Sequence, residues 1–561
     1  MTKMMDYFKE LKAQITNKEL WDKNQFYIYD YEASSGKSTN TFQFVGEMTK
    51  TKPYRVLYVQ RFLKDDELGN TVATINEHAG RRVAETFTGE DAKKVKSRRK
   101  AKDAQVLCLT HKMYISFCKG NHEEFWKDRN ILIIDEYPDF LERVTLSKDE
   151  IGYLWMMEYL YKDESIKTLV YKLRKSLMET EINRKVENGN ELILVEFDDR
   201  EFCLIRDRMP SIIDSVSGTK EKEILGKIEQ VLTNGCYFYE EAFHTFNNKI
   251  QMLLLDNNII LDANGFDYRY SLSKKYHVKQ QPKIYDYSPS TLNHIEIKTS
   301  KKELSSQINL PEKTFHAILP EQMGKTLFIS DKENKAIIEK KLTEYLLNRY
   351  DSEKVQAMMN EKFKIDYFGN IIGVNSYRDF DNVVIMKTPN FDYLAYALTY
   401  MYYRLNDQQS VGNVSVFQHE EVEKIRKTVI AGEIYQAIKR VNRDNSRVSN
   451  MYVLTDNQDV IDFVVNQLPG IQYKKTSMQA NNKSDTKSRT KIVKKFDQQV
   501  EGTIRAIMDA KRSGAIYIQK KAIREEIGIS DKSNFSKIMK AIQGFLEVNG
   551  FDMNGQKIIL R

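Results

Sequence analysis

The stretch Asn130-Ile131-Leu132-Ile133-Ile134-Asp135-Glu136-Tyr137-Pro138 decides the fold class of this chain. Four consecutive aliphatic residues that end in two carboxylates predict a buried parallel strand with polar groups at its carboxyl end. Open α/β sheets bind their ligands at that end of the strands. An ordinary buried strand followed by a helix-capping aspartate would show the same local pattern, so the neighbouring segments must decide between the two interpretations.

A loop of small residues follows an earlier predicted strand. Residues 25–29 have the composition of a strand, and Glu32-Ala33-Ser34-Ser35-Gly36-Lys37-Ser38-Thr39 comes directly after them. A strand, a loop that ends in Gly-Lys-Ser and a continuing helix form the arrangement in which backbone N–H groups wrap a phosphate. The sequence therefore predicts an ATP site with Lys37 at the β- and γ-phosphates; its residues are Ser35, Gly36, Lys37, Ser38 and Thr39.

Two carboxylates complete the predicted nucleotide site. Ser38 and Asp135 would hold Mg²⁺, a cation that prefers oxygen ligands and keeps several waters. Glu136 would orient the water that attacks the γ-phosphate. A second Gly-Lys-Thr, at residues 324–326, precedes a predicted strand instead of following one. No helix N-terminus would face a phosphate there, so we interpret it as a turn.

Further buried strands with polar carboxyl ends are predicted at residues 55–61, 105–111 and 258–262. Because such strand ends face the same side of a doubly wound sheet, they would place Arg61, Thr110 and His111 on one surface beside Asp135. A hydrogen-bonded structural role for His111 stays open. From about residue 144 to residue 256 the pattern is helical and charged, with a hairpin-like pair at 191–196 and 202–205, which predicts an insertion.

A second α/β series occupies residues 301–476. Its predicted strands lie at residues 326–330, 366–370, 383–386 and 451–454. A predicted helix over residues 433–443 carries Gln436, Arg440 and Arg443 at positions i, i+4 and i+7, so one face presents an amide and two guanidiniums. That face is either solvated or placed opposite the phosphate loop, where arginines neutralise transition-state charge.

The C-terminal residues form a separate predicted module. Residues 477–490 are polar and lack an apolar period, which predicts a flexible linker. Residues 491–561 then show three helical segments and a hairpin turn at Asn554-Gly555, the order of a winged helix-turn-helix. Its third helix, 532–545, would expose groups that suit phosphate and major-groove contact, namely Lys532, Asn534, Lys537 and Lys540. Docking of a protein partner is the alternative use of such a module.

Composition bounds the class of protein. The chain has 561 residues, of which 41% are hydrophobic and 30% charged, and no apolar run approaches the roughly 18 residues of a membrane span. With a polar N-terminus this predicts a cytoplasmic protein. The four cysteines show no C-x-x-C spacing, so the sequence indicates neither a zinc site nor disulfides. Residues 477–561 hold 17 Lys+Arg against 9 Asp+Glu, whereas the rest is balanced at 70 of each sign.

Taken in order, these segments resemble the motifs of superfamily 2 helicases of the DEAD/DEAH type. Residues 32–38 are similar to motif I, 59–61 to motif Ia, 110–111 to motif Ib and 261–264 to motif III. Asp135-Glu136 resembles motif II, residues 373–377 occupy the place of motif V, and residues 436–443 are similar to motif VI. The resemblance covers roughly residues 25 to 455. This sequence departs from the family pattern at Tyr31 and Ser34 in motif I and at Lys439, which replaces the motif VI glycine.

The resemblance implies an α/β fold with two RecA-like P-loop NTPase lobes and ATP in the cleft between them. The first lobe would span residues 1–300 with the mostly helical insertion, the second 301–476, followed by the linker and the winged helix-turn-helix. The catalytic residues that the resemblance implies are Asp135, Glu136, Gln436, Arg440 and Arg443. The residues that it implies for coupling hydrolysis to movement are Asp262, Gly373 and Asn375.

The function that the resemblance implies is an ATP-dependent helicase or translocase. It would use ATP and Mg²⁺ and act on DNA, single-stranded in the cleft between the lobes and duplex at the winged helix. The alternative is a nucleotide-sensing DNA-binding regulator, or a replication-initiation factor, without unwinding activity. Glu136 and the two arginines favour hydrolysis, because binding alone would not require them.

Overall fold

The computed structural model describes residues 7–61, 66–161, 164–186, 190–299, 310–319, 324–371, 376–478, 499–500, 502–529, 532–543, 546 and 551–560. The chain divides into two compact units, Met1–Met478 and Gln479–Arg561. Two of the predicted coupling residues, Gly373 and Asn375, lie outside the described residues. Nearly all of the predicted linker, residues 477–490, lies outside them as well.

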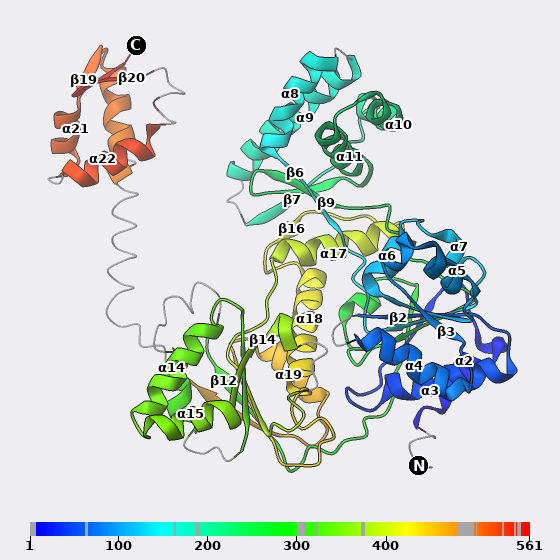
Figure 1. Cartoon of the computed structure of the whole chain (residues 1–561). Helices are drawn as coiled ribbons and strands as arrows, with labels where there is room; N and C mark the ends of the chain where they lie inside the picture. The colour runs from blue at the N-terminus through cyan, green and yellow to red at the C-terminus, as the bar shows by residue number, and fades with distance from the viewer. Residues whose placement is uncertain are drawn as a thin grey trace. The chain divides into compact units, whose positions relative to one another are not determined.

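A seven-stranded sheet forms the centre of the first lobe (Figure 1), with the strand order β11-β1-β10-β5-β2-β4-β3. All of its pairings are parallel. The buried strand predicted within residues 130–138 is confirmed as β5, which lies between β10 and β2 with its four aliphatic residues fully buried. The strands are β1 Phe26–Tyr29, β2 Val56–Gln60, β3 Ala84–Phe87, β4 Val106–Thr110, β5 Ile131–Asp135, β10 Asn257–Leu261 and β11 Tyr276–Lys279.

Both faces of this sheet are covered, as a doubly wound fold requires. Along β2, Val56 and Tyr58 belong to one hydrophobic cluster and Leu57 and Val59 to another, because successive side chains of a strand point to opposite faces. The helices of the lobe are α2 Lys9–Thr16, α3 Lys37–Thr51, α4 Glu67–Ala79, α5 Val95–Asp103, α6 His111–Cys118 and α7 Glu123–Trp126.

A six-stranded parallel sheet forms the second lobe, with the order β14-β13-β15-β17-β12-β18. The predicted α/β fold with two parallel sheets is confirmed. The second sheet takes β12 from residues 291–296, ahead of the boundary predicted at 301, because β12 pairs with β17 and β18. The strands are β12 Thr291–Glu296, β13 Thr326–Ser330, β14 Phe363–Tyr367, β15 Asn382–Ile385, β17 Asn450–Thr455 and β18 Gln472–Ser477.

The helices of the second lobe follow the same α/β alternation. The second Gly-Lys-Thr does precede a strand, β13, and no helix begins there. The strand predicted at 366–370 lies earlier, since β14 ends at Tyr367 and a helical turn follows. The helices are α13 Leu310–Ile318, α14 Lys335–Leu347, α15 Ser352–Glu361, α16 Phe368–Ile371, α18 Glu420–Ile438 and α19 Gln458–Asn466.

Within its described residues, the predicted insertion contains four helices and the strands β6 to β9 of an antiparallel sheet, whose order is β16-β7-β8-β9-β6 (Figure 1). The strand predicted at residues 202–205 is wrong. These residues lie in α10, because the Asp199 side chain accepts hydrogen bonds from the backbone N–H groups of Glu201 and Phe202 and caps a helix there. The elements are β6 Arg143–Ser147, α8 Lys148–Tyr161, α9 Glu164–Val186, β7 Glu191–Val195, α10 Arg200–Ser215, α11 Thr219–Asn234, β8 Cys236–Tyr239 and β9 Ala242–Phe246.

A segment from the second half of the chain joins this region. Strand β16, Val414–Ser415, pairs with β7, and helix α17, Tyr393–Asn406, packs into the hydrophobic cluster under the first sheet. Residues that follow β15 of the second lobe therefore contribute to the core of the first lobe.

The C-terminal unit has a small antiparallel sheet of order β19-β21-β20 and its own apolar core. The predicted turn at Asn554-Gly555 is confirmed, since β20 and β21 pair across it and Gly555 has φ +55°. Its elements are β19 Tyr517–Gln519, α21 Lys520–Glu526, α22 Lys532–Ala541, β20 Asp552–Asn554 and β21 Lys557–Ile559. In the parts of the chain that the structure describes, no helix is both long and apolar enough to span a membrane.

Candidate functional site

A cavity of about 670 Å³ lies at the carboxyl end of β5 and is lined by residues of both lobes. Most of the residues predicted for nucleotide binding and catalysis lie around it. Those that line it are Gly36, Lys37, Ser38, Thr39, Asp135, Glu136, Gln436, Arg440 and Arg443. The structure therefore brings together two groups of residues that are separated by about 300 positions in the sequence.

The predicted phosphate-binding loop links β1 to α3. Gly36 precedes the first residue of α3 and has φ +89°, a left-handed conformation that glycine adopts without steric cost. The first N–H groups of a helix lack intrahelical partners, and the helix dipole favours an anion there. Ser35 is fully buried and does not line the cavity, and its hydroxyl has no hydrogen-bond partner among the described residues. The loop geometry suits a bound phosphate.

The two side chains predicted to hold Mg²⁺, Ser38 and Asp135, contact each other beside Lys37. The Ser38 hydroxyl donates to Oδ2 of Asp135 at 2.5 Å, and the Tyr58 hydroxyl approaches the same oxygen at 3.4 Å. Burial raises the pKa of Asp135, while the charge of Lys37 acts in the opposite direction. No cluster of three or more His, Cys, Asp or Glu side chains that could hold a metal occurs within the described residues. A hydroxyl and one carboxylate fit Mg²⁺, which keeps waters and phosphate oxygens as its other ligands.

Glu136 faces the cavity from a constrained backbone. Its φ is +69°, and its N–H donates to the carbonyl of Leu261 at 3.0 Å. Burial alone would raise the pKa of Glu136, but the positive charges of Lys37, Arg61 and Arg440 outweigh it and lower that pKa. Adjacent carboxylates with pKa values shifted in opposite directions are typical of sites where the two have different roles.

The predicted helical face of Gln436, Arg440 and Arg443 is wrong in its geometry and correct in its location. Helix α18 ends at Ile438, so Gln436 lies in its last turn and both arginines follow its end. The chain turns there because Lys439 caps the helix and Asn442 has φ +41°. All three predicted side chains still line the cavity.

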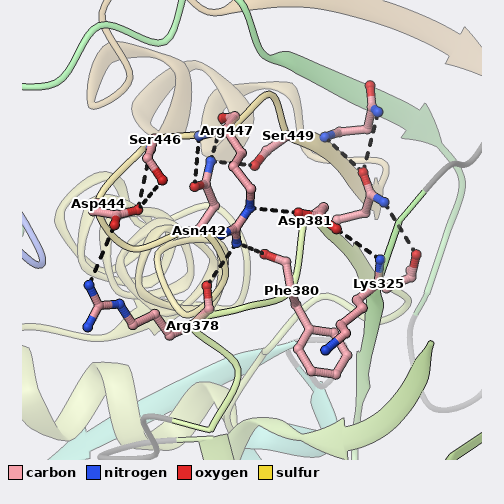
Figure 2. A network of polar contacts seen from close by, with 12 residues as sticks. Lys325, Arg378, Phe380, Asp381, Asn442, Asp444, Ser446, Arg447 and Ser449 are labelled. Atoms are coloured by element: carbon pink, nitrogen blue, oxygen red, sulfur yellow. Dashed lines mark hydrogen bonds and ion pairs between the residues drawn. The ribbon is translucent and has the colours of Figure 1, made fainter. Parts of the chain in front are cut away.

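The segment 439–449, which we call the arginine turn, is anchored to the second lobe by a polar network (Figure 2). The Arg447 guanidinium donates to the Asp381 carboxylate at 2.7 Å and to the carbonyl of Phe380 at 3.2 Å. The Asn442 amide donates to the carbonyl of Arg447 at 2.6 Å and to the Ser449 hydroxyl at 2.9 Å. The sequence did not indicate this network, because Asp381 and Arg447 are 66 residues apart.

Arg378, Asp444 and Lys439 are further cavity residues that the sequence did not predict as functional. Arg378 and Asp444 form an ion pair at 3.5 Å, which Figure 2 shows at the edge of the network. Lys439 was visible in the sequence only as a departure from the glycine of the motif it resembles. The proximity of these groups to the predicted phosphate loop follows from the tertiary structure alone.

The three first-lobe residues predicted to contact nucleic acid are engaged within the lobe. Arg61 lines the cavity and pairs with Glu136 at 3.3 Å. The Thr110 hydroxyl caps α6 by accepting from the N–H of Met113. His111 Nε2 donates to the carbonyl oxygen of Asp135 at 3.0 Å, and burial lowers the pKa of His111 to about 4, so its ring is neutral near pH 7. Their contact with nucleic acid stays a prediction.

Asp262 lies at the end of β10, next to the cavity residue Ala263. It is buried and accepts hydrogen bonds from the Tyr270 hydroxyl at 2.6 Å and from the N–H of Asn264 at 2.9 Å. Asn264 in turn packs against α18, where a Cβ on Gly432 would lie 3.2 Å from its side chain. The segment that follows Asp262 thus touches the helix that carries Gln436, and its coupling role stays a prediction.

In the C-terminal unit, two of the four residues predicted for duplex contact are exposed. Lys537 and Lys540 lie on the solvent face of α22, whose buried face carries Phe535 and Ile538. The side chains of the other two, Lys532 and Asn534, lie outside the described residues.

No protein-family model and no curated protein matches this chain. Among solved structures, it is similar to S. tokodaii Xpd4, at 13% identity over 85% of this chain and 100% of that chain, with a TM-score of 0.48. It is also similar to S. cerevisiae Dbp5 bound to RNA and ADP BeF3, at 8% identity over 88% and 97% of the two chains, with a TM-score of 0.34. A third is the DUF1998 helicase MrfA bound to DNA and AMPPNP, at 10% identity over 100% and 61%, with a TM-score of 0.37. These are distant similarities of fold, and function rests on the residues of the cavity.

Proposed function

We propose that this protein is an ATP-dependent helicase or translocase that acts on DNA. The observation that carries the proposal is the convergence of Lys37, Glu136 and Arg440 on one cavity between two parallel-sheet lobes. A lysine at a helix N-terminus, an ionised carboxylate and guanidiniums from a second lobe are the groups that phosphoryl transfer to water requires. A site that only bound a nucleotide would not need all of them.

In this proposal the triphosphate of ATP lies at the N-terminus of α3, with Lys37 against its terminal phosphates. Ser38 and Asp135 would hold Mg²⁺, which would neutralise charge on the β- and γ-phosphates. Glu136 would accept a hydrogen bond from the attacking water, whose oxygen would bond to the γ-phosphorus as the bond to the β-phosphate oxygen breaks. ADP would leave, and the proton of the water would pass to the released phosphate or to solvent. Arg440 and Arg443 face the charge that develops on the transferred group.

Hydrolysis would drive movement because the cavity is shared between the lobes. Binding of ATP favours a closed arrangement and product release an open one, which alters the grip on a single strand of DNA in the cleft. The C-terminal unit would act as a winged helix-turn-helix that adds duplex affinity through Lys532, Asn534, Lys537 and Lys540. The positive charge of residues 477–561 supports that assignment.

A nucleotide-sensing DNA-binding regulator is the second candidate. The ion pair between Arg61 and Glu136 favours it, because that contact occupies the carboxylate that hydrolysis needs. In a sensor the pair would persist with ATP bound. In a hydrolase Glu136 would exchange this contact for the attacking water.

The experiment that tests the proposal measures ATP hydrolysis by the full chain alone and with single-stranded DNA, duplex DNA or RNA. We expect slow hydrolysis by the protein alone and stimulation by DNA, together with ATP-dependent strand displacement or displacement of a bound protein block. Tight ATP binding without turnover under all four conditions would favour the regulator. Stimulation by RNA but not by DNA would show that the substrate is RNA, while the proposed ATP-dependent helicase or translocase activity would stand.

A further inference from the structure

A buried carboxylate stands at the beginning of the phosphate-binding loop. Glu32 is fully buried, and each of its oxygens has a partner. Oε2 accepts hydrogen bonds from the N–H groups of Ile284 at 2.8 Å and Tyr285 at 3.2 Å. Oε1 accepts from the Tyr287 hydroxyl at 2.5 Å. The loop is therefore fixed to the segment that connects the two sheets.

The Tyr287 hydroxyl also accepts a hydrogen bond from Lys439. The Lys439 ammonium lies 2.7 Å from that oxygen, and the residue is only 4% exposed. Its nitrogen is 4.4 Å from the centroid of the Tyr285 ring, within the range of a cation–π contact. We call Glu32, Tyr287 and Lys439 the relay. It runs from the phosphate loop of the first lobe to the C-terminal cap of α18 in the second.

Three more contacts hold the same part of the loop. The Tyr285 hydroxyl donates to the carbonyl of Ser34 at 3.0 Å, and Arg443 Nε donates to the Ser34 hydroxyl at 3.1 Å. Ser34 has φ +69°, a conformation that a serine adopts only where its surroundings hold it. The N–H of Ala33 faces the Tyr435 hydroxyl of α18 at 3.3 Å. Each of the loop residues 32–34 is therefore bound by the segment between β11 and β12, by α18 or by the arginine turn.

We propose that Lys439 is a positioning residue for ATP hydrolysis, acting through Tyr287 and Glu32 to hold the phosphate loop and the arginine turn in one geometry. This inference rests on the proposed function. Lys439 immediately precedes Arg440, so a shift of the relay moves a guanidinium that faces the phosphate. A buried ammonium is costly unless it is paired, and here the relay supplies its partners. Lysine thereby gains a role at a position where the motif it resembles has glycine.

The ionisation of Lys439 supplies a readout that misfolding would not produce. Burial lowers its pKa to about 8, and the charged groups around it are Glu32 and Asp444, which raise that pKa, and Arg443, which lowers it further. The phenols of Tyr285 and Tyr287 also face it, and burial raises the pKa of both. Because the folded pKa lies below the ordinary value of 10.5, losing this proton between pH 8 and 10.5 does not destabilise the fold. A loss of activity above pH 8 would therefore report the relay.

The first test compares steady-state kinetics of the full chain and of Lys439→Met, with Lys424→Met on the exposed side of α18 as the matched control. We expect kcat for ATP to fall by about tenfold to a hundredfold in Lys439→Met while KM changes little, because displaced groups act on the transition state. Lys424→Met should keep its kcat. The decline of kcat above pH 8 should be present in the wild type and absent in Lys439→Met.

Tyr287→Phe removes only one hydroxyl, so it keeps the test valid if Lys439→Met fails to fold. The double variant Lys439→Met/Tyr287→Phe should be no slower than the slower single variant, since both break the same relay. Unchanged kcat in Lys439→Met and Tyr287→Phe, both folded, would overturn the positioning role.

A second measurement separates failure of the relay from failure of the proposed function. Denaturant unfolding of Glu32→Gln, Lys439→Met and the double variant gives a coupling free energy that does not depend on ATP hydrolysis. If Glu32 and Lys439 are energetically coupled but the protein hydrolyses no ATP, the proposed function is refuted, and the positioning role with it. The relay then remains as a structural contact. Additive effects of the two substitutions would refute the relay itself.

Discussion

At the scale of single residues, Lys37 and Glu136 supply the charges that ATP hydrolysis would use. Replacing Lys37 with Ala, or Glu136 with Gln, should lower turnover by about a hundredfold or more, because each group acts on charge that develops in the transition state. Glu136→Gln should still bind ATP, since the amide has nearly the same shape. A coupled hydrolysis assay and calorimetric titration of ATP measure the two effects, with the exposed Glu123→Gln as control.

The two arginines of the second lobe permit a more selective substitution. Arg440→Lys and Arg443→Lys keep the positive charge and lose the planar fork, so hydrolysis should fall by roughly tenfold or more while ATP binding changes little. Arg82→Lys, at a surface side chain that is 66% exposed, should behave as the wild type. Unchanged turnover in both cavity variants would show that the arginine turn has no catalytic role.

How far these residues could be predicted depends on how local their signals are. Lys37 and Asp135 follow buried strands, and a run of aliphatic residues that stops at a polar group is visible in the sequence. Glu32 and Lys439 carry no such signal, because their common partner is a tyrosine that lies 255 residues from one and 152 from the other. Their contact exists only after the two lobes have packed.

At the scale of elements, the arginine turn depends on Arg447. This side chain bonds to the Asp381 carboxylate and to two carbonyls, those of Phe380 and Arg378. Arg447→Ala should lower the free energy of unfolding by about 1 kcal/mol, because it removes three hydrogen bonds from a side chain that is 40% exposed, where water replaces part of them. Asp381→Asn should lower the free energy of unfolding by less, since the amide oxygen of asparagine can still accept a hydrogen bond from Arg447. Chemical denaturation measures both, and equal stability of wild type and Arg447→Ala would contradict the anchoring of the turn.

Helix boundaries were the least predictable elements. The periodicity of Gln436, Arg440 and Arg443 fits a continuing helix, yet the helix ends at Ile438 because the arginine turn satisfies the chain's backbone groups elsewhere. Strands of the two central sheets were easier to predict, since burial on both faces makes them short aliphatic runs. Residues 202–205 form such a run inside a helix, and only the capping Asp199 distinguishes the two cases.

At the scale of the whole molecule, the charge distribution separates two activities. A chain that ends at Met478 keeps β18 complete at the edge of the second sheet, so it should retain ATP hydrolysis and single-strand binding. Its duplex affinity should fall, and so should the salt dependence, because each neutralised phosphate contributes a slope of roughly 0.9. Titration of fluorescent duplex and single-stranded DNA at several salt concentrations tests this. An unchanged duplex slope would assign the C-terminal unit to protein docking.

The two ends of helix α18 are packed into different hydrophobic cores. Val422 and Ile425 are buried with the first lobe, and Ile434 and Ile438 with the second. Its 19 residues extend for about 28 Å, and neither end can leave its core without exposing apolar surface to water. Relative movement of the two lobes along this helix is thereby resisted. The helix therefore holds the two hydrophobic cores at a fixed separation.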